Sequence, residues 1–495
     1  METPLNKHII MLPMMAQGHL IPFLELAHQL INKNSSFTIT IVNSPLNINY
    51  LHTAIANHPS LPSQIHLQPL EFNSSNHGLP PNSENTEGLS LAQVIKLFHA
   101  GASLEAPLRQ FINDVVANEG RPPVCIISDV FMGWANEVAK SFGIFNYSFT
   151  TGGAYGTAAY SSIWLNLPHR NLVTGETHDE FPVPGFPDSC RFSINLLHQF
   201  IKVADGNDEW SRFFQPQLSK SLQSSGWLCN TIEEIEPLGL EVLKNYIKLP
   251  VWCIGPLVPS KMLKKNTASG LIGLRAGKEP SIRAEKCIEW LDMHPERSVL
   301  YISFGSQNTI SETQMMELAE GLEESGKPFI WVIRPPIGFD LKGEFKPEWL
   351  PSGFEDRVGK QGLMVHNWAP QLEILCHRST GAFLTHCGWN SVMESLSQGV
   401  PMIGWPLAAE QGYNAKMLVE EMGVCIVLTR GVHTKIDKKE VRKVIDVVLD
   451  ETQDGKGENM RRKASELGEL IRASVEIDKG SSYKAMDDFV SIILS

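Results

Sequence analysis

Short apolar runs alternate with helix-like patterns along almost the whole chain, and this alternation limits the fold to the α/β class. The apolar runs are rich in β-branched residues with little polar alternation, which is typical of parallel strands buried on both faces. The helix-like segments between them repeat apolar residues at three- and four-residue spacing, as in Leu20–Ile31. The predicted strands are 8–13, 37–44, 64–70, 124–129, 143–150, 298–306, 328–334, 362–368, 381–388 and 401–406. This order predicts two doubly wound, Rossmann-like domains.

A polar tract rich in Lys, Ser and Gly separates the two sets of strands. It covers 260–282 and has no strong periodicity, so we expect a linker there. A chain of 495 residues is also too long for one ordinary core. The predicted divisions are a first domain at 1–256, a linker at 257–283, a second domain at 284–476 and a C-terminal helix at 477–495. Whether that helix returns to the first domain is left open.

Composition excludes several classes of function. A formal net charge of -12 argues against a nucleic-acid partner, because phosphate backbones need basic surfaces. The eight cysteines form no CxxC pair, which favours free thiols in a reducing compartment over zinc or disulfides. The N-terminal run lacks a small-residue cleavage site, and no apolar stretch is long enough to span a bilayer. We therefore expect a cytoplasmic protein without membrane insertion, and a monomer.

The segment from Trp368 to Gln411 offers a group for each part of a sugar nucleotide. A buried strand, a turn at Gly388 and a helix beginning near Asn390 and Ser391 follow one another. The first turn of a helix presents backbone N–H groups and a partial positive charge, so it can receive a diphosphate without lysine. An acidic chain can thus bind an anionic ligand by local means.

Other side chains of this segment match the remaining parts of such a ligand. Glu394 lies one turn along the helix, where a carboxylate can accept both ribose hydroxyls. Trp368 ends a strand and could stack on a pyrimidine, while backbone groups near Gln371 read the base edge. Glu410 and Gln411 follow another strand and could meet the sugar. Each has an ordinary alternative as a core aromatic, a helix cap or a solvated residue, and only their joint spacing favours binding.

His19 and Asp129 are the candidate catalytic pair. His19 follows the first strand and opens a helix predicted at 19–31, where the helix dipole disfavours imidazolium and keeps the ring able to accept a proton. Asp129 ends the strand 124–129, so adjacent strands could bring its carboxylate against the ring. The alternative is that His19 caps the helix and Asp129 starts a turn. Thr150 or Thr151, after the strand 143–150, could touch the outer hydroxyls of a sugar.

These motifs resemble a known family. WAPQLEILCHRSTGAFLTHCGWNSVMESLSQGVPMIGWPLAAEQ, at Trp368–Gln411, is similar to the signature segment of plant family 1 UDP-dependent glycosyltransferases, and its 44 residues match in length. The likeness extends from MLPMMAQGHLIPFLELAHQL to the tail and is strongest in the second half. It implies the GT-B fold, with an acceptor-binding first domain and a UDP-sugar-binding second domain facing each other across a cleft.

The resemblance also implies roles for residues. His19 would be the base and Asp129 its partner, while Trp368 would stack on uracil and Glu394 would bind the ribose. His386, Asn390, Ser391 and Ser306 would hold the phosphates, and Trp389, Glu410 and Gln411 would hold the sugar. The full predicted donor-binding set is Thr151, Ser306, Trp368, Ala369, Gln371, His386, Gly388, Trp389, Asn390, Ser391, Glu394, Glu410 and Gln411. No metal is expected, since the helix start takes the charge of the leaving diphosphate.

The predicted function is therefore an inverting hexosyl transfer from a UDP-sugar to a small lipophilic acceptor, in plant secondary metabolism. Gln411 resembles glucose-preferring members of the family, and galactose users tend to have His there. The acceptor loops are expected at 78–92, 151–165 and 181–200, whose apolar residues suit a flavonoid, other phenolic or terpenoid. Two alternatives stay open: extension of an existing glycoside, and a UDP-sugar-binding protein without chemistry. The first strand lacks GxGxxG and the chain lacks a GxSxG elbow, which argue against a dinucleotide oxidoreductase and a serine hydrolase.

Overall fold

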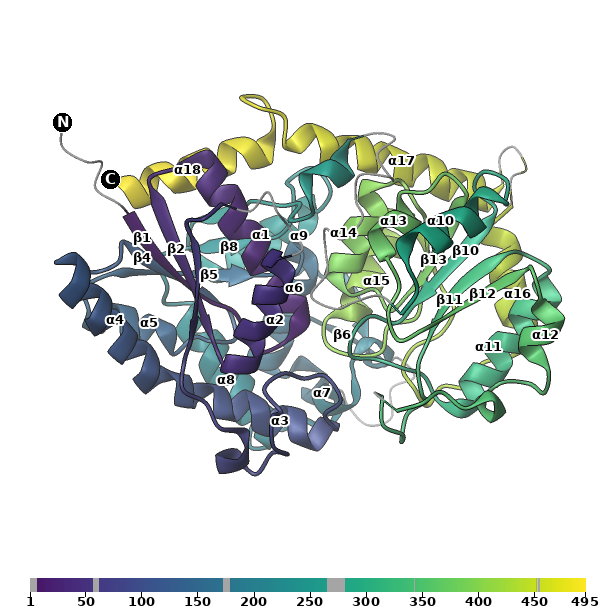
Figure 1. Cartoon of the computed structure of the whole chain (residues 1–495), viewed down its shortest axis with the longest axis horizontal. Helices are drawn as coiled ribbons and strands as arrows, with labels where there is room; N and C mark the ends of the chain where they lie inside the picture. Colours follow the sequence, from purple (N-terminus) through teal and green to yellow (C-terminus); the bar gives the residue numbers. More distant parts are fainter. Residues whose placement is uncertain are drawn as a thin grey trace. The chain divides into compact units, whose positions relative to one another are not determined.

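The computed structural model describes residues 7–56, 62–171, 179–264, 281–341, 343–450, 452 and 455–495. The chain forms two compact units, the first made of Met1–Leu257 with Ser474–Ser495 and the second of Val258–Ala473 (Figure 1). Both units are built on parallel sheets with helices on their faces, which confirms the predicted α/β class. No helix in the described ranges has both the length and the apolar character required to cross a bilayer.

The first unit has a seven-stranded sheet in the order β3-β2-β1-β4-β5-β8-β9, and every neighbouring pair is parallel. In the strand Lys7–Leu12, which lies inside the sheet, the successive residues Ile9, Ile10, Met11 and Leu12 are all fully buried. Because successive side chains point to opposite faces, both faces of this sheet are covered. The strands are β1 (Lys7–Leu12), β2 (Phe37–Asn43), β3 (Ile65–Pro69), β4 (Cys125–Asp129), β5 (Phe145–Thr150), β8 (Trp227–Cys229) and β9 (Val251–Cys253), with a separate hairpin of β6 (Glu180–Pro182) and β7 (Arg191–Ser193).

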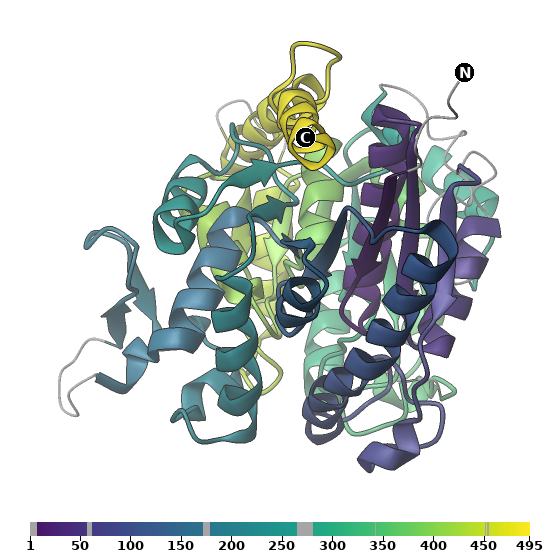
Figure 2. The same ribbon diagram turned by 90° about the vertical axis from the view of Figure 1, so that its left-hand side faces the viewer.

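Helices lie on both sides of this sheet, as Figure 2 shows. They are α1 (Gln17–Lys33), α2 (Pro45–Ala56), α3 (Leu91–Ala100), α4 (Glu105–Glu119), α5 (Ala135–Ser141), α6 (Ala154–Asn166), α7 (Gln199–Val203), α8 (Glu209–Ser221), α9 (Pro237–Ile247) and α18 (Ser481–Leu494). Apolar residues of α1, α2 and α18 form one core with the strands.

The C-terminal helix α18 is part of the first unit. The ring of Phe489 packs edge-on against Tyr147 at 5.0 Å and lies 5.3 Å from Trp252. The indole N–H of Trp252 donates to Asp488 at 2.7 Å. The apolar face predicted for the chain's end therefore covers strands β5 and β9.

The second unit has a six-stranded parallel sheet in the order β12-β11-β10-β13-β14-β15. Its strands are β10 (Val299–Ser303), β11 (Phe329–Ile333), β12 (Gly362–His366), β13 (Thr380–Thr385), β14 (Met402–Gly404) and β15 (Cys425–Val427). Its helices are α10 (Ala284–Asp292), α11 (Glu312–Ser325), α12 (Phe354–Val358), α13 (Gln371–Leu375), α14 (Trp389–Ser397), α15 (Gln411–Glu420), α16 (Lys438–Val448) and α17 (Lys456–Ser474). Residues of α11, α12 and α16 form the core on one face of the sheet.

Within the predicted linker, Leu257 belongs to the first unit and Val258 begins the second. Val258 and Met262 are buried against Leu372 of α13, because these side chains are apolar within an otherwise polar tract. These two residues of the predicted linker at 257–283 therefore pack with the second unit, and the predicted division itself stays a prediction. Residues 265–280 of the predicted linker lie outside the described residues.

Candidate active site

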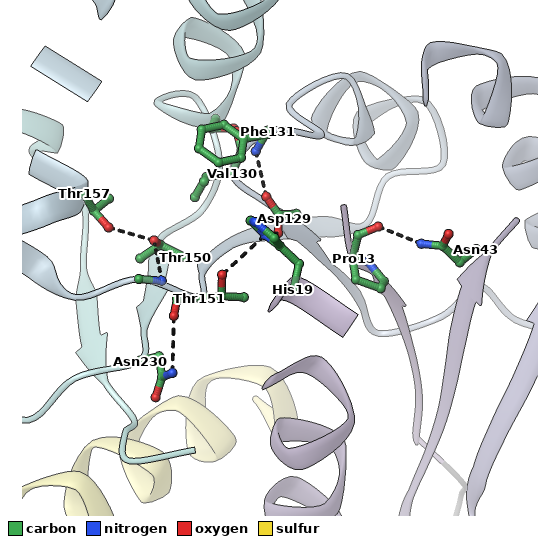
Figure 3. A network of polar contacts seen from close by, with 12 residues as sticks. Pro13, His19, Asn43, Asp129, Val130, Phe131, Thr150, Thr151, Thr157 and Asn230 are labelled. Atoms are coloured by element: carbon green, nitrogen blue, oxygen red, sulfur yellow. Dashed lines mark hydrogen bonds and ion pairs between the residues drawn. The ribbon is translucent and has the colours of Figure 1, made fainter. Parts of the chain in front are cut away.

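The first unit brings His19 and Asp129 together where two adjacent strands end. Strand β1 pairs directly with β4, so the turn after β1, which leads into α1, lies beside the end of β4. The imidazole Nδ1 of His19 is 2.6 Å from Oδ2 of Asp129 (Figure 3). The other carboxylate oxygen of Asp129 accepts from the backbone N–H of Phe131 at 3.0 Å. Both oxygens of Asp129 therefore have partners that hold the carboxylate in one orientation.

This contact determines what the imidazole can do. Asp129 is fully buried, whereas the side chain of His19 is 24% exposed. Beside an ionised carboxylate Nδ1 carries the proton, which leaves Nε2 as the atom able to accept one. Helix α1 begins at Gln17, two residues before the predicted start, because Ala16 is the last extended residue. His19 still lies in the first turn of the helix.

Thr151 lies against the imidazole of His19. Its hydroxyl oxygen is 3.3 Å from Nδ1 of His19, and its carbonyl accepts from the side-chain amide of Asn230 at 3.3 Å (Figure 3). The neighbouring Thr150 bonds to Thr157 of α6 at 2.8 Å. The threonine turn therefore supports the ring from the β5 side, and a contact of Thr151 with a sugar stays a prediction.

Aromatic side chains continue from His19 into the first unit. The ring of Phe131 lies 6.0 Å from the His19 ring, 6.0 Å from Tyr160 and 5.3 Å from Phe214. Tyr160 and Phe214 are buried. Atoms next to this ring would meet an apolar and aromatic wall, which suits a flat organic molecule.

In the second unit, His386 occupies space that two glycines leave open. A Cβ atom at Gly305 would lie 2.6 Å from the imidazole, and one at Gly388 would lie 2.4 Å from it. Gly305 also has a φ of +77°, a conformation that L side chains rarely adopt. Burial, and secondarily the charge of Arg334, lowers the pKa of His386 to about 4. The ring is therefore neutral at pH 7, and its Nδ1 is buried without a hydrogen-bond partner in the described structure.

Helix α14 starts directly after this histidine. Gly388 precedes its first residue, Trp389, and provides no side-chain cap, as the sequence predicts for a turn that leaves backbone N–H groups for a ligand. Ser391 and Glu394 are both buried on this helix. Asn390 is half-buried in its first turn.

Gln371 links the start of α13 to α14. Its side-chain amide donates to Oε2 of Glu394 at 2.6 Å and to the hydroxyl of Ser391 at 3.1 Å. Its oxygen accepts from the hydroxyl of Tyr301 at 3.2 Å. The side chain of Gln371 thus orients the carboxylate predicted for the ribose, and the backbone contact with a base that the sequence predicts here stays a prediction.

The indole of Trp368 stands in the turn between β12 and α13. Trp368 is half-buried, and Ala369 beside it is buried. The residue before it, Asn367, has a left-handed φ of +64°. The backbone N–H of Trp368 donates to the carbonyl of His366 at 2.8 Å, so this turn is tight.

The remaining predicted residues follow β10 and β14. Ser306 lies in the turn after β10, next to Gly305, and is half-buried. Glu410 precedes α15, and Gln411 is its first residue. The side-chain oxygen of Gln411 accepts from the backbone N–H groups of Leu407 and Ala408, each at 2.9 Å. Gln411 thus shapes the loop that precedes it.

Sequence reasoning missed two residues of this unit. Arg334 follows β11 and donates from two nitrogens to the carbonyl of Asn367. Asn414 is fully buried in α15 and donates to the carbonyl of Cys387 at 3.0 Å. Arg334 follows a strand, so the rule that selected Ser306 could also have selected it. Asn414 lies within a helix, and no local signal distinguishes it.

Within the described ranges, no group of three or more His, Cys, Asp or Glu side chains is arranged to hold a metal ion. All eight cysteine positions are described, and each is a free thiol.

Comparison with known proteins gives consistent matches. The sequence profile described as UDP-glucoronosyl and UDP-glucosyl transferase matches residues 259–461. The chain is 40% identical to UDP-glycosyltransferase 92A1 of Arabidopsis thaliana, covering 98% of this chain and 97% of that protein. It is 43% identical to crocetin glucosyltransferase 3 of Crocus sativus, covering 91% and 92%.

A solved structure has the same fold over its full length. It is a UDP-glucosyltransferase from Polygonum tinctorium capable of glucosylating indoxyl, in complex with 3,4-dichloroaniline. It superposes with a TM-score of 0.80 at 28% identity and covers 100% of both chains. The profile match at residues 259–461 and the full-length similarity to these relatives show the family, and the solved structure shows the fold. The chain therefore belongs to the UDP-glycosyltransferase family and is a glycosyltransferase with the GT-B fold.

Proposed function

We propose that this enzyme transfers glucose from UDP-glucose to a hydroxyl group of a small, largely apolar acceptor, with inversion at the anomeric carbon. The observation that carries this proposal is the 2.6 Å contact between His19 and Asp129 at neighbouring strand ends. A histidine held this way can serve as the general base that accepts the proton of the acceptor hydroxyl.

The reaction is a single displacement. Nε2 of His19 takes the proton of the acceptor hydroxyl while that oxygen forms a bond to the anomeric carbon. The bond from this carbon to the UDP oxygen breaks, and UDP leaves with the electron pair. Asp129 stabilises the imidazolium that results, as the acidic member of a catalytic triad does. One displacement on an α-linked donor yields a β-glycoside.

The donor would be bound by the second unit. Trp368 is proposed to stack on uracil with Ala369 beside it, and Glu394, oriented by Gln371, is proposed to accept the ribose hydroxyls. The residues proposed for the phosphates are Ser306, His386, Gly388, Asn390 and Ser391, and those proposed for the sugar are Thr151, Trp389, Glu410 and Gln411. Because this set includes neutral donors and a helix start, we expect turnover to survive removal of divalent metals by EDTA.

The acceptor class follows from two kinds of support. The names of the two glucosyltransferases compared above include crocetin and indoxyl, both small organic molecules. The rings of Phe131, Tyr160 and Phe214 continue from His19 in the first unit, which suits a planar acceptor. A flavonoid, other phenolic or terpenoid is therefore proposed.

The test measures UDP release from UDP-glucose with a panel of phenolic, terpenoid and glycoside acceptors. We expect release only when an aglycone acceptor is present, and a β-linkage in the product by NMR coupling constants. Release without acceptor would indicate a hydrolase, and UDP-sugar binding without release across the panel would favour a binding protein. Activity confined to glycoside acceptors would favour the sugar–sugar transferase. Competition of UDP-glucose with UDP-galactose tests the donor, and a galactose preference would refute the glucose assignment.

We also propose that the enzyme acts as a cytoplasmic monomer, as its sequence predicts. Light scattering after gel filtration would test the monomer, and imaging of a fluorescent fusion would test the compartment.

A further inference from the structure

Arg334 is a buried cation at the carboxyl end of the second unit's sheet. It follows β11 directly and is 8% exposed. Its Nε and Nη2 atoms both donate to the carbonyl oxygen of Asn367, at 3.0 and 2.9 Å. Burying a guanidinium costs desolvation, and the hydrogen bonds that it donates offset part of that cost. These two bonds also tie the end of β11 to the turn that follows β12.

The carbonyl of Asn367 lies in the peptide group that carries the indole of Trp368. A peptide group is planar, so its carbonyl oxygen and the N–H of the next residue move together. Here Arg334 holds the oxygen, while the N–H of Trp368 donates to the carbonyl of His366 at 2.8 Å. The peptide plane is thus held at both edges.

The backbone beside this peptide also departs from ordinary strand geometry. Asn367 has a φ of +64°, and its own N–H donates to the carbonyl of Ile333 at 3.0 Å. Asparagine adopts a positive φ more readily than other residues with a side chain, which allows this turn. The two hydrogen bonds from Arg334 stabilise the turn that orients Trp368.

The charge of Arg334 also acts on the phosphate side of the unit. It adds to the burial that lowers the pKa of His386, which favours the neutral imidazole. Arg334 further lines a small cavity with Gly305 and Asn308, at the ends of β10 and β11. These contacts place a positive charge close to the predicted diphosphate site of an acidic chain.

We propose that Arg334 is a positioning residue for the nucleotide, which fixes the Asn367–Trp368 peptide and thereby orients the indole that stacks on uracil. This inference rests on the proposed donor site. In this proposal Arg334 affects uracil binding through its two hydrogen bonds to the Asn367 carbonyl, which orient Trp368. Arg334 itself makes no direct contact with the phosphates.

Arg334→Lys separates the fork from the charge. Lysine keeps the positive charge but cannot donate twice to one carbonyl in this planar geometry. Arg334→Gln removes the charge and can still donate once. The matched control is Arg461→Lys, because Arg461 is 5% exposed in the same unit and also holds backbone carbonyls, including that of Val448 at 3.0 Å. Arg461 lies in α17, and its hydrogen-bond partners Glu458, Val448 and Asp450 are not among the predicted donor residues.

The experiment measures dissociation constants of uridine and UDP by calorimetry, KM and kcat with UDP-glucose, and melting temperature. In Arg334→Lys we expect both dissociation constants to rise about tenfold or more, since hydrogen bonds to charged groups are strong. KM for UDP-glucose should rise with them. We expect kcat to change less than about threefold, because the lost interaction binds the nucleotide equally in the ground state and the transition state. Arg461→Lys should lower the melting temperature about as much as Arg334→Lys does, and it should leave both dissociation constants within about twofold of those of the unaltered enzyme.

Three results would overturn the inference. Weaker UDP binding with unchanged uridine binding in Arg334→Lys would point to a phosphate contact. Unchanged binding of both ligands in Arg334→Lys and Arg334→Gln would remove any role in nucleotide binding. An equal loss in Arg461→Lys would reduce the effect to general destabilisation. If the unaltered enzyme bound neither uridine nor UDP, the proposed donor site itself would fail, which is a distinct outcome.

Discussion

The two units use the same architectural rule for different chemistry. In each, functional side chains follow the carboxyl ends of parallel strands, as expected for open α/β sheets. The first unit presents a histidine bonded to a buried carboxylate, a pair that can take up a proton during the reaction. The second presents amides, hydroxyls, a helix start and the buried carboxylate of Glu394, and its buried Arg334 is bonded to backbone. Changes in the first unit should therefore reduce kcat, and changes in the second should raise KM.

The largest expected effect comes from His19→Ala. Loss of a general base lowers turnover by about 10²–10⁴-fold, and we expect kcat to fall by this factor. UDP binding should stay within about twofold, because His19 belongs to the unit without the predicted nucleotide contacts. Steady-state kinetics with UDP-glucose and calorimetry with UDP measure the two quantities. Loss of UDP affinity in this variant would contradict the division between the units.

His8→Gln is the matched control. His8 is buried in β1, with its two ring nitrogens 2.7 Å from Glu119 and 2.8 Å from Thr40. It pairs with a carboxylate much as His19 does, but within a strand and away from its carboxyl end. Its replacement should destabilise the fold by about 1–3 kcal/mol and leave kcat of the folded enzyme nearly unchanged.

Glu394→Gln tests the second unit. The carboxylate is fully buried and accepts from Gln371 at 2.6 Å, so glutamine would weaken both that contact and the predicted bonds to the ribose. We expect the dissociation constant of UDP to rise about 10- to 100-fold, which matches the value of hydrogen bonds to a charged group. The affinity for 2′-deoxy-UDP should fall much less. A ratio between the two ligands that stays at the value of the unaltered enzyme would refute the ribose contact.

The fold was predictable because its signals are local. The strands predicted at 124–129 and 298–306 correspond to β4 and β10 of the structure, whose ends differ from the predicted ones by a few residues. The position of His19 near a helix start and the placement of Asp129 after an apolar run were also readable along the chain. The adjacency of β1 and β4 then follows from the topology of doubly wound sheets.

What the sequence could not supply depends on contacts between distant residues. The bonds from the Arg334 side chain to the backbone carbonyl of Asn367 and from the Gln371 side chain to the carboxylate of Glu394 join residues 33 and 23 positions apart. Their existence depends on side-chain directions that strand and helix periods do not determine. For the same reason the sequence could not show that the hydroxyl of Thr151 lies 3.3 Å from the imidazole of His19, and its contact with a sugar stays a prediction.

Each unit also contains a histidine whose strongly lowered pKa gives stability a pH dependence. Burial lowers the pKa of His198 to about 3 and that of His386 to about 4, from an ordinary value of 6.5. Below pH 6.5 the unfolded chain therefore binds protons that the folded chain does not. The stabilisation is fully present above pH 6.5 and is lost as the pH falls toward 4, by about 2 kcal/mol per histidine at pH 5.

Urea unfolding at pH 7 and pH 5 measures this loss. His198→Gln and His386→Gln should each reduce the difference by about 2 kcal/mol, and each should act on the transition of its own unit if the units unfold separately. An unchanged pH dependence in both variants would mean that other groups control acid unfolding.

The smallest expected effect is on the choice of sugar. The side-chain oxygen of Gln411 is bonded to the N–H groups of Leu407 and Ala408, so only its amide nitrogen can act on the donor as a hydrogen-bond donor. Gln411→Glu keeps the acceptor oxygen for the loop and removes that donor, whereas Gln411→His alters both. We expect Gln411→His to shift the ratio of kcat/KM for UDP-glucose and UDP-galactose by about three- to tenfold toward galactose, because the two sugars differ at one hydroxyl. Gln411→Glu should lower kcat/KM for UDP-glucose without that shift and keep the melting temperature. If both variants kept this kcat/KM ratio and the kcat/KM for UDP-glucose, Gln411 would only stabilise the loop at Leu407 and Ala408. The choice of sugar in the second unit would then have to come from Glu410 or Trp389.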